Sequence, residues 1–118
     1  MSHALILYGA LLLSAAWAAD EERQVEGTLV DRKCARFYQD SPAELSGHGK
    51  KCALGCKEEG YGVLVGKDFL TFDAAGNRLA EQWLEKTSKD KNLKVIVIFQ
   101  LDSSKRSYTV KSITDAPE

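Results

Sequence analysis

The chain has 118 residues, and its sixteen Lys and Arg side chains nearly balance its seventeen Asp and Glu side chains. The two signs are interspersed, so the charge favours neither nucleic acid nor an anionic membrane surface as a partner. A chain of this length, once an apolar leader is removed, suits one domain with a modest core.

Residues 1–19 have the composition of a leader. No charged residue occurs between residues 4 and 19, and the small-x-small run Ala16-Trp17-Ala18 precedes the acidic residues that begin at Asp20. This pattern predicts a secretory signal peptide that is cleaved near Ala18 or Ala19. The alternative is a retained anchor, although the run is shorter than the about 20 apolar residues that span a bilayer. We therefore expect a periplasmic or secreted protein, with membrane contact only if the leader is retained.

The mature part begins with a β pattern that a cysteine-rich insert interrupts. Residues 20–24 are charged and predict a loose terminus, whereas apolar and polar residues alternate from Val25 to Asp31 as in a strand. Gly27 allows that strand a bend or a close approach. Turn-forming residues then break the pattern over residues 32–60. Two short helices are expected in this insert, over about 42–46 and 49–58, and the second carries two of the cysteines.

Four further strands and one longer helix follow the insert. Residues 61–66 and 69–72 predict a hairpin, and residues 73–77 predict a turn. An amphipathic helix is expected from about Asn77, with Leu79 and Trp83 facing the core. Residues 93–101 are almost continuously apolar, which predicts a strand that is buried on both faces. Residues 107–113 predict the last strand.

This order of elements predicts a fold class. The protein is expected to be mainly β with one or two short helices. Five strands with a helix between the third and the fourth predict a five-stranded OB-like barrel, closed or partly open. The cysteine-rich helical insert lies between strands 1 and 2, and residues 20–118 are expected to form a single OB-like domain.

The three cysteines of the chain are Cys34, Cys52 and Cys56. Thiols tend to pair in an oxidising compartment, and an odd number leaves one over. Cys52 and Cys56 are four residues apart, so on a helix their Cβ atoms lie side by side, which suits a mutual disulfide poorly. We therefore expect a disulfide between Cys34 and either Cys52 or Cys56. The remaining thiol makes a disulfide-linked dimer an option.

The same residues also allow a metal site. His48, Cys52 and Cys56 follow one another at steps of four, and with Cys34 they offer three thiolates and one imidazole. That set suits Zn²⁺ or Cu(I). Two simpler interpretations stand beside it: His48 is a solvated loop residue between two glycines, and the cysteines are inert.

The spacing of these residues resembles that of a group of small exported bacterial proteins. The shared pattern is Gly27-x3-Asp31-x2-Cys34 and then His48-x3-Cys52-x3-Cys56-x3-Gly60, followed by a strand and a terminal hairpin. Those proteins are described as OB-like barrels, and no activity is known for them. The resemblance implies a fold and an export route, and it carries over no catalytic residue.

Nothing in the pattern of side chains indicates an enzyme: there is no Ser/His/Asp arrangement, phosphate loop or convincing carboxylate pair. Asp31, beside Arg32 and Lys33, is expected to be a strand-end salt-bridge partner. Four aromatic residues form either core or a small binding face on the barrel, namely Tyr61, Phe69, Phe72 and Tyr108.

Three functions are consistent with these features. The first is a non-enzymatic exported binding or interaction module, stabilised by a Cys34 disulfide and recognising a protein or a small ligand. The second is a metal-binding or metal-carrying protein that uses Cys34, His48, Cys52 and Cys56. The third is a thiol-redox protein that acts through Cys52 or Cys56.

Overall fold

The computed structural model describes residues 20–117, so the predicted signal peptide and its cleavage site lie outside the described residues. The elements, in chain order, are β1 (Asp20–Asp31), α2 (Arg32–Asp40), the 3₁₀ helix η1 (Pro42–Gly47), α3 (Lys50–Gly55), the 3₁₀ helix η2 (Lys57–Glu59), β2 (Tyr61–Val65), β3 (Asp68–Thr71), α4 (Ala74–Lys86), β4 (Lys94–Asp102) and β5 (Ser107–Asp115). The prediction of a mainly β protein with a helix between the third and fourth strands is confirmed.

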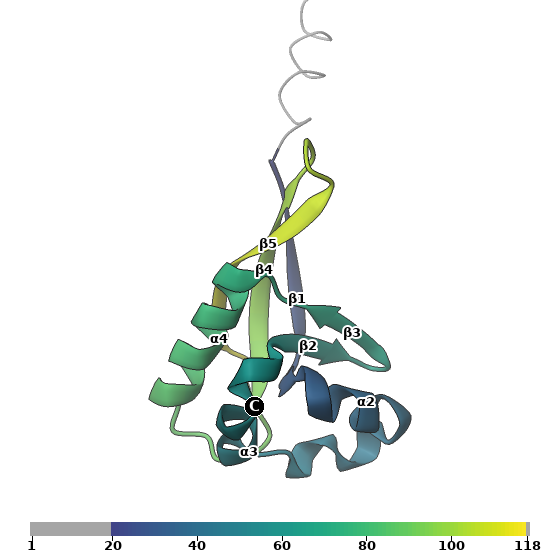
Figure 1. Ribbon diagram of the computed structural model, residues 1–118, viewed down its shortest axis with the longest axis vertical. Helices are drawn as coiled ribbons and strands as arrows, with labels where there is room; N and C mark the ends of the chain where they lie inside the picture. Colours follow the sequence, from purple (N-terminus) through teal and green to yellow (C-terminus); the bar gives the residue numbers. More distant parts are fainter. Residues whose placement is uncertain (1–19, 118) are drawn as a thin grey trace, which may run out of the picture.

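The five strands form one antiparallel sheet in the order β3-β2-β1-β4-β5 (Figure 1). Strand β1 joins the two halves of this sheet, because its first part pairs with β4 and its end pairs with β2. Gly27 lies near this change of partner, where an added Cβ would be 2.6 Å from the Leu64 carbonyl oxygen, so the expected close approach is confirmed. Within residues 20–117 no ladder joins β3 to β5. The sheet is therefore not closed, and the barrel remains a prediction.

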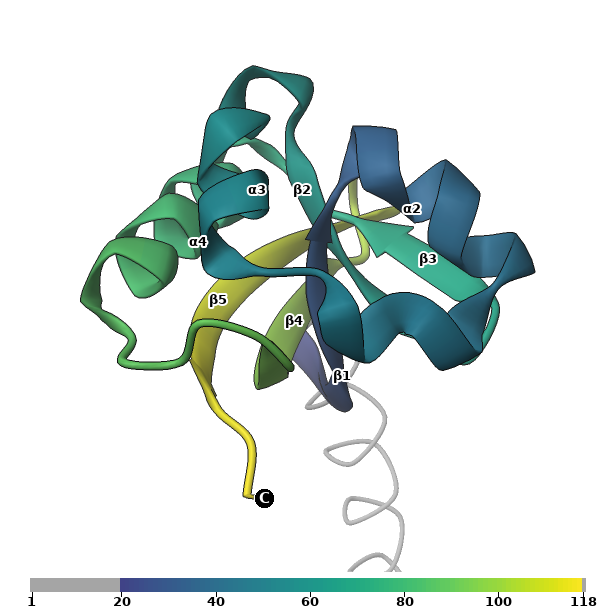
Figure 2. The same cartoon turned by 90° about the horizontal axis from the view of Figure 1, so that it is seen from below.

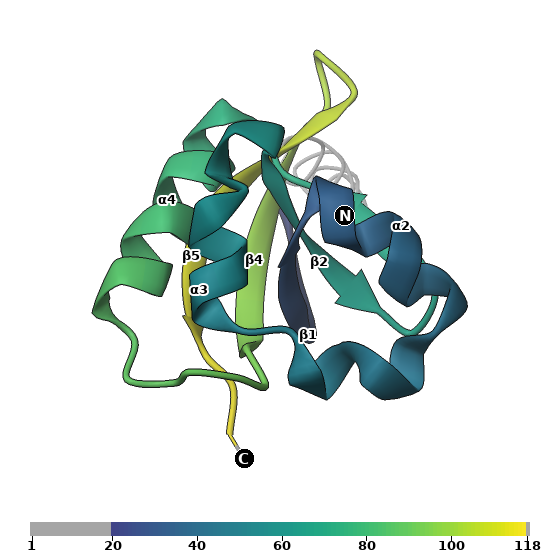
Figure 3. The same cartoon turned by 60° about the horizontal axis from the view of Figure 1, so that its bottom comes forward.

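Helical segments cover both faces of the sheet. Figures 2 and 3 show α3 and α4 together on one side, and α2 with η1 on the other. Neighbouring residues of a strand point to opposite faces, so Leu29 and Val30 of β1 enter different cores. Leu29 belongs to the larger core beside α4, and Val30 belongs to a smaller core with Ala35 and Leu64. The insert thus packs on the face opposite α4 through α2.

Three local predictions are wrong, and two of them fail for the same reason. Asp31 does end β1 and pairs with His48, but Asp31 and Asp73 are also helix N-caps, which accept hydrogen bonds from the N–H groups of Cys34 and Gly76. Helix α2 was therefore missed, and α4 begins at Ala74 rather than near residue 77. The third error concerns residues 20–24, which belong to β1 because the long strand β4 extends far enough to pair with them.

Strand β4 is less enclosed than predicted. Over residues 95–99 buried and half-buried residues alternate, and Val95, Val97 and Phe99 are the ones that enter the core. The other face of β4 is therefore only partly covered. Among the described residues, no helix combines the length and the apolar character needed to cross a membrane.

Candidate metal centre

Asp31 lies where the sheet meets the insert. It ends β1, caps α2, and its side chain is fully buried. Its Oδ2 atom accepts a hydrogen bond from the backbone N–H of Cys34 at 3.0 Å, and its Oδ1 atom lies 3.1 Å from Nε2 of His48. Burial alone raises the pKa of Asp31, but the bonds from His48 and Cys34 outweigh it and hold the pKa below its ordinary value. Asp31 is therefore a buried carboxylate whose partner is His48 rather than an adjacent basic residue.

His48 is buried, so its interpretation as a solvated loop residue is wrong. Its exposed fraction is 2%, and its backbone N–H donates to the Leu45 carbonyl at the end of η1 at 3.0 Å. The ring of Tyr38 packs edge-on against the imidazole, with ring centroids 5.5 Å apart. Packing and the bond to Asp31 thus hold the imidazole in one orientation.

The two ring nitrogens of His48 have different surroundings. An ionised Asp31 only accepts hydrogen bonds, so Nε2 of His48 is the donor in this pair. When the ring carries this one proton alone, Nδ1 presents a lone pair. Among the described residues, Nδ1 has no hydrogen-bond partner although it is buried. A buried polar atom without a partner costs about 1–3 kcal/mol. In the tautomer with the proton on Nε2, the site offers the lone pair of Nδ1, and the bond from Nε2 to Asp31 fixes the orientation of the ring.

Two cysteines lie beside this imidazole. One ligand atom from each of Cys34, His48 and Cys52 lies within 4.8 Å of the other two. Cys34 is half-buried near the start of α2, and Cys52 is exposed near the start of α3. Because Asp31 also binds the backbone N–H of Cys34, this one carboxylate positions two of the three groups.

Hydrogen bonds to the segment after α4 position the third group. The backbone N–H of Lys50 donates to the Asp90 carbonyl at 2.8 Å, and Nζ of Lys50 donates to the Thr87 carbonyl at 2.9 Å. An added Cβ at Gly49 would lie 2.9 Å from the same Asp90 oxygen, so only glycine allows this approach without a shift. These contacts fix the start of α3 and, with it, the position of Cys52.

Cys56 is not a member of the group formed by Cys34, His48 and Cys52. The helix expected over residues 49–58 is divided, because α3 ends at Gly55 and Cys56 is its C-cap. All three cysteines are free thiols, so the structure contains no Cys34 disulfide. Of the two predicted partners of Cys34, only Cys52 belongs to the group.

Two of the three thiols, those of Cys34 and Cys56, have a pKa above the ordinary value of cysteine. Burial and the nearby Asp31 carboxylate raise the pKa of Cys34 to about 12, and burial raises the pKa of Cys56. The thiolate is the reactive form of cysteine. Neither residue is therefore activated as a nucleophile. A bound cation would have the opposite effect, because thiols that coordinate a metal are deprotonated.

The separation of the three groups is compatible with one ion after a small adjustment. Ligand atoms at 2.0–2.3 Å from a tetrahedral Zn²⁺ are about 3.3–3.8 Å apart. Groups that lie within 4.8 Å of one another must therefore approach by at most about 1.5 Å. Cys52 is the exposed member, so its side chain has the most freedom to make this movement.

The predicted aromatic face is only partly at the surface. Tyr61 and Phe72 are 1% and 3% exposed and belong to the larger core, so they do not contribute to a binding face. The alternation along β2 turns Tyr61 inward, where its hydroxyl donates to the Ala53 carbonyl at 2.9 Å. Phe69 and Tyr108 line a hollow of about 380 Å³ between β3 and β5.

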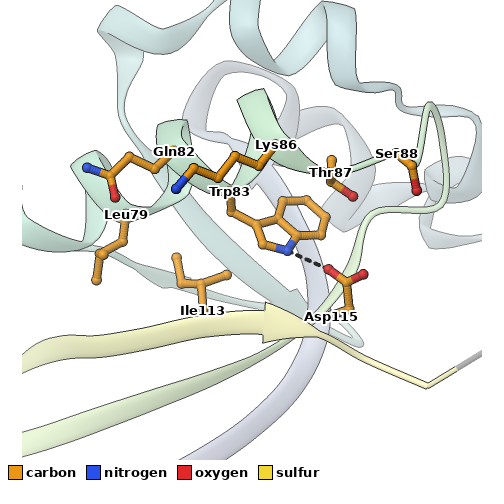
Figure 4. A pocket seen from close by; sticks show the side chains of 8 residues that line it. All are labelled: Leu79, Gln82, Trp83, Lys86, Thr87, Ser88, Ile113 and Asp115. Carbon is orange, nitrogen blue, oxygen red and sulfur yellow. Dashed lines mark hydrogen bonds between the residues drawn. The ribbon is translucent and has the colours of Figure 1, made fainter.

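A second hollow, of about 400 Å³, lies between α4 and β5 (Figure 4). Trp83 and Leu79 face it from α4, and the indole N–H of Trp83 donates to Oδ1 of Asp115 at 2.7 Å. The aromatic and aliphatic side chains that were expected in the core therefore also form one wall of a surface depression. Neither hollow is lined by Cys34, His48 or Cys52.

In comparisons with family models, curated proteins and solved structures, nothing matches this chain. The interpretation of the site therefore depends on the geometry of its own residues.

Proposed function

We propose that this protein binds one thiophilic cation, Zn²⁺ or Cu(I), through the sulfurs of Cys34 and Cys52 and through Nδ1 of His48. Two observations carry the proposal: Nδ1 of His48 is buried without a partner, and the imidazole belongs to a group with the thiols of Cys34 and Cys52. Soft thiolates and imidazole are the ligand types that both cations prefer. In this proposal Cys56 is not a ligand, which narrows the four-residue set expected from the sequence.

Asp31 would not bind the metal itself but would accept a hydrogen bond from the metal ligand His48. A histidine that binds a metal commonly donates its other ring N–H to a carboxylate, which sets the tautomer and makes the ring more basic. The Asp31–His48 pair has this arrangement, with Nε2 directed to the carboxylate and Nδ1 left for the ion. A hydrogen-bonded buried carboxylate also places a negative charge near the cation.

Three protein ligands leave a further coordination position. A structural Zn²⁺ site is usually closed by four protein ligands, whereas an open position admits a ligand from another molecule. Cys52 is exposed, so the open side would face solvent. We therefore favour metal binding and carriage over a purely structural role, and we assign no catalytic step.

The surrounding fold is proposed to be a partly open OB-like barrel. The strand order β3-β2-β1-β4-β5 and the position of α4 match that topology apart from the missing ladder between β3 and β5. One contact already spans this gap, because Oδ1 of Asp73, after β3, accepts from the N–H of Val110 in β5 at 3.2 Å. Export by the predicted signal peptide to the periplasm or the exterior is part of the same proposal.

A binding or interaction module is the second candidate function. The apolar hollow between β3 and β5 favours it, because Phe69, Phe99 and Tyr108 line it and Tyr108 is 44% exposed. Hollows lined by aromatic side chains are common ligand sites. This candidate does not depend on the metal site, and the ligand is either a small molecule or a protein segment.

Titration of the reduced full chain with Zn²⁺, and anaerobically with Cu(I), tests the first proposal. A chelator of known affinity reports the free metal, and elemental analysis gives the stoichiometry. We expect one ion per chain, with loss of binding in Cys52→Ser and retention in Cys56→Ser. These two variants make the same chemical change four residues apart, which makes them a matched pair. Equal effects of the two substitutions, or the absence of stoichiometric binding by the reduced chain, would refute the assignment.

A further inference from the structure

Cys34 and Cys52 are close enough to serve a second chemistry besides metal binding. Their sulfurs are members of the group that lies within 4.8 Å, and they approach from two different helices, α2 and α3. A disulfide bond is about 2.05 Å long. The remaining gap of less than about 3 Å is one that rotation of two cysteine side chains can close.

We propose that Cys34 and Cys52 form a redox gate: the dithiol holds the cation, and a Cys34–Cys52 disulfide releases it. This inference rests on the proposed metal site, because it concerns the same two sulfurs. A disulfide removes both thiolate ligands at once. His48 alone then remains, and a single neutral imidazole does not retain Zn²⁺ or Cu(I) against the solvent.

The structure selects this pair over the two that involve Cys56. Cys56 lies outside the group and caps the end of α3, whereas Cys34 and Cys52 flank the same imidazole. The two cysteines also lie on segments that different hydrogen bonds hold in place. Cys34 is bound through its N–H to Asp31, and the start of α3 is bound to the segment after α4. Closure of the bond therefore needs local side-chain movement rather than rearrangement of the sheet.

The reaction balances with a low-molecular-weight disulfide, such as oxidised glutathione, as the oxidant. The thiolate of Cys52, the exposed residue, attacks one glutathione sulfur and forms a mixed disulfide, and the first glutathione thiolate leaves. The Cys34 sulfur then attacks the Cys52 sulfur of that mixed disulfide, and the second glutathione thiolate leaves. Two protein thiols are oxidised, one glutathione disulfide is reduced to two thiols, and the two protons of the protein thiols end on glutathione.

The exposure of the two residues suits this order. Cys52 is open to solvent and can meet a small disulfide, whereas Cys34 is half-buried and is reached within the chain. The second step is intramolecular, so the proximity of the two sulfurs favours it.

Metal and oxidant should compete for the same pair. Only a chain without bound metal has free sulfurs, and at a free Zn²⁺ concentration one hundred times the Kd about 1% of the chains are metal-free. Disulfide formation at a fixed glutathione disulfide concentration should therefore slow about a hundredfold. Cys56 is free in both states, so its alkylation should not respond to the metal.

The experiment follows the full chain, loaded with Zn²⁺ in the reduced state, as oxidised glutathione is added. Released Zn²⁺ is read with a chromophoric chelator, and alkylation with peptide mass mapping identifies the linked residues. We expect one Zn²⁺ released per disulfide formed, a chain lighter by two hydrogens, and a linkage between Cys34 and Cys52. The Cys56→Ser variant should behave in the same way, whereas Cys52→Ser should form no internal bridge to Cys34.

The outcomes separate the gate from the metal site. If the reduced chain binds no Zn²⁺ or Cu(I), the metal proposal fails and the gate fails with it. If the reduced chain binds metal but keeps it after full oxidation, or if the bridge includes Cys56, only the gate is overturned. Protection of the pair by Zn²⁺ together with release on oxidation supports both.

Discussion

Replacement of Asp31 by Asn should separate the metal site from the stability of the fold. Asn is as good a helix N-cap as Asp, so its amide oxygen can keep the bond from the Cys34 N–H. The amide NH₂ group then faces Nε2 of His48, where the carboxylate oxygen lay. Nε2 must become the acceptor, which moves the ring proton to Nδ1. In that tautomer Nδ1 has no lone pair for a cation.

The size of the effect follows from the geometry. Loss of the carboxylate behind a metal-binding histidine typically weakens metal affinity 10- to 100-fold, which corresponds to about 1.4–2.7 kcal/mol. The metal-free protein should change less. It exchanges a charge-assisted hydrogen bond for a neutral one, which lowers the free energy of unfolding by about 1 kcal/mol. Removal of a buried charge offsets part of that loss.

Two measurements on the reduced protein test this prediction. Competition with a chelator gives the Zn²⁺ affinity, and urea denaturation without metal gives the free energy of unfolding. The matched control is Asp73→Asn, which changes the N-cap of α4 in the same way but lies on a different helix from Cys34 and Cys52. That control should leave the Zn²⁺ affinity unchanged.

One result would refute the reasoning. If Asp31→Asn binds Zn²⁺ within twofold of the unchanged chain while the fold is intact, Nδ1 of His48 is not a ligand. If both Asn variants weaken binding equally, the effect comes from helix capping and not from the imidazole.

Three further outcomes are expected. Tyr61→Phe should make the free energy of unfolding less sensitive to alkaline pH. Burial raises the pKa of Tyr61 in the folded protein, so the unfolded chain loses this proton first, from about pH 10. Above that pH the free energy of unfolding falls by up to about 1.4 kcal/mol per pH unit, and below it the contribution of Tyr61 is complete. Urea unfolding of both proteins between pH 9 and 11 checks this, and equal slopes would contradict it. Gly49→Ala should lower both the free energy of unfolding and the Zn²⁺ affinity, because the new Cβ would lie 2.9 Å from the Asp90 carbonyl oxygen; unchanged affinity would show that α3 is not positioned there. Trp83→Phe should lower the free energy of unfolding by about 1–3 kcal/mol, since Asp115 loses a hydrogen bond, and Zn²⁺ affinity should not change.

The insert shows how far the sequence could predict the site. All three members of the group were named from residue type and spacing, because Cys and His are rare enough here to stand out. The capping role of Asp31 was not predicted, although a weak signal was present: Asp is a preferred helix N-cap residue, and Asp31 directly follows the predicted strand. That cap would have predicted the start of α2. The exclusion of Cys56 had only a weak signal, Gly55 in the middle of the expected helix.

The sequence by itself determined the strands, the helix between the third and fourth strands, and the residue types available for a metal, because periodicity and composition act locally along the chain. The tertiary structure decided which of those residues meet. Asp31 and His48 are 17 residues apart, and their contact arises because α2 and η1 turn the chain back toward the end of β1. Cys52 joins them because hydrogen bonds hold the start of α3 against the segment after α4. Cys56 is not a member of the group, because α3 ends at Gly55. Contacts of this kind depend on packing between distant segments, which spacing along the chain does not record.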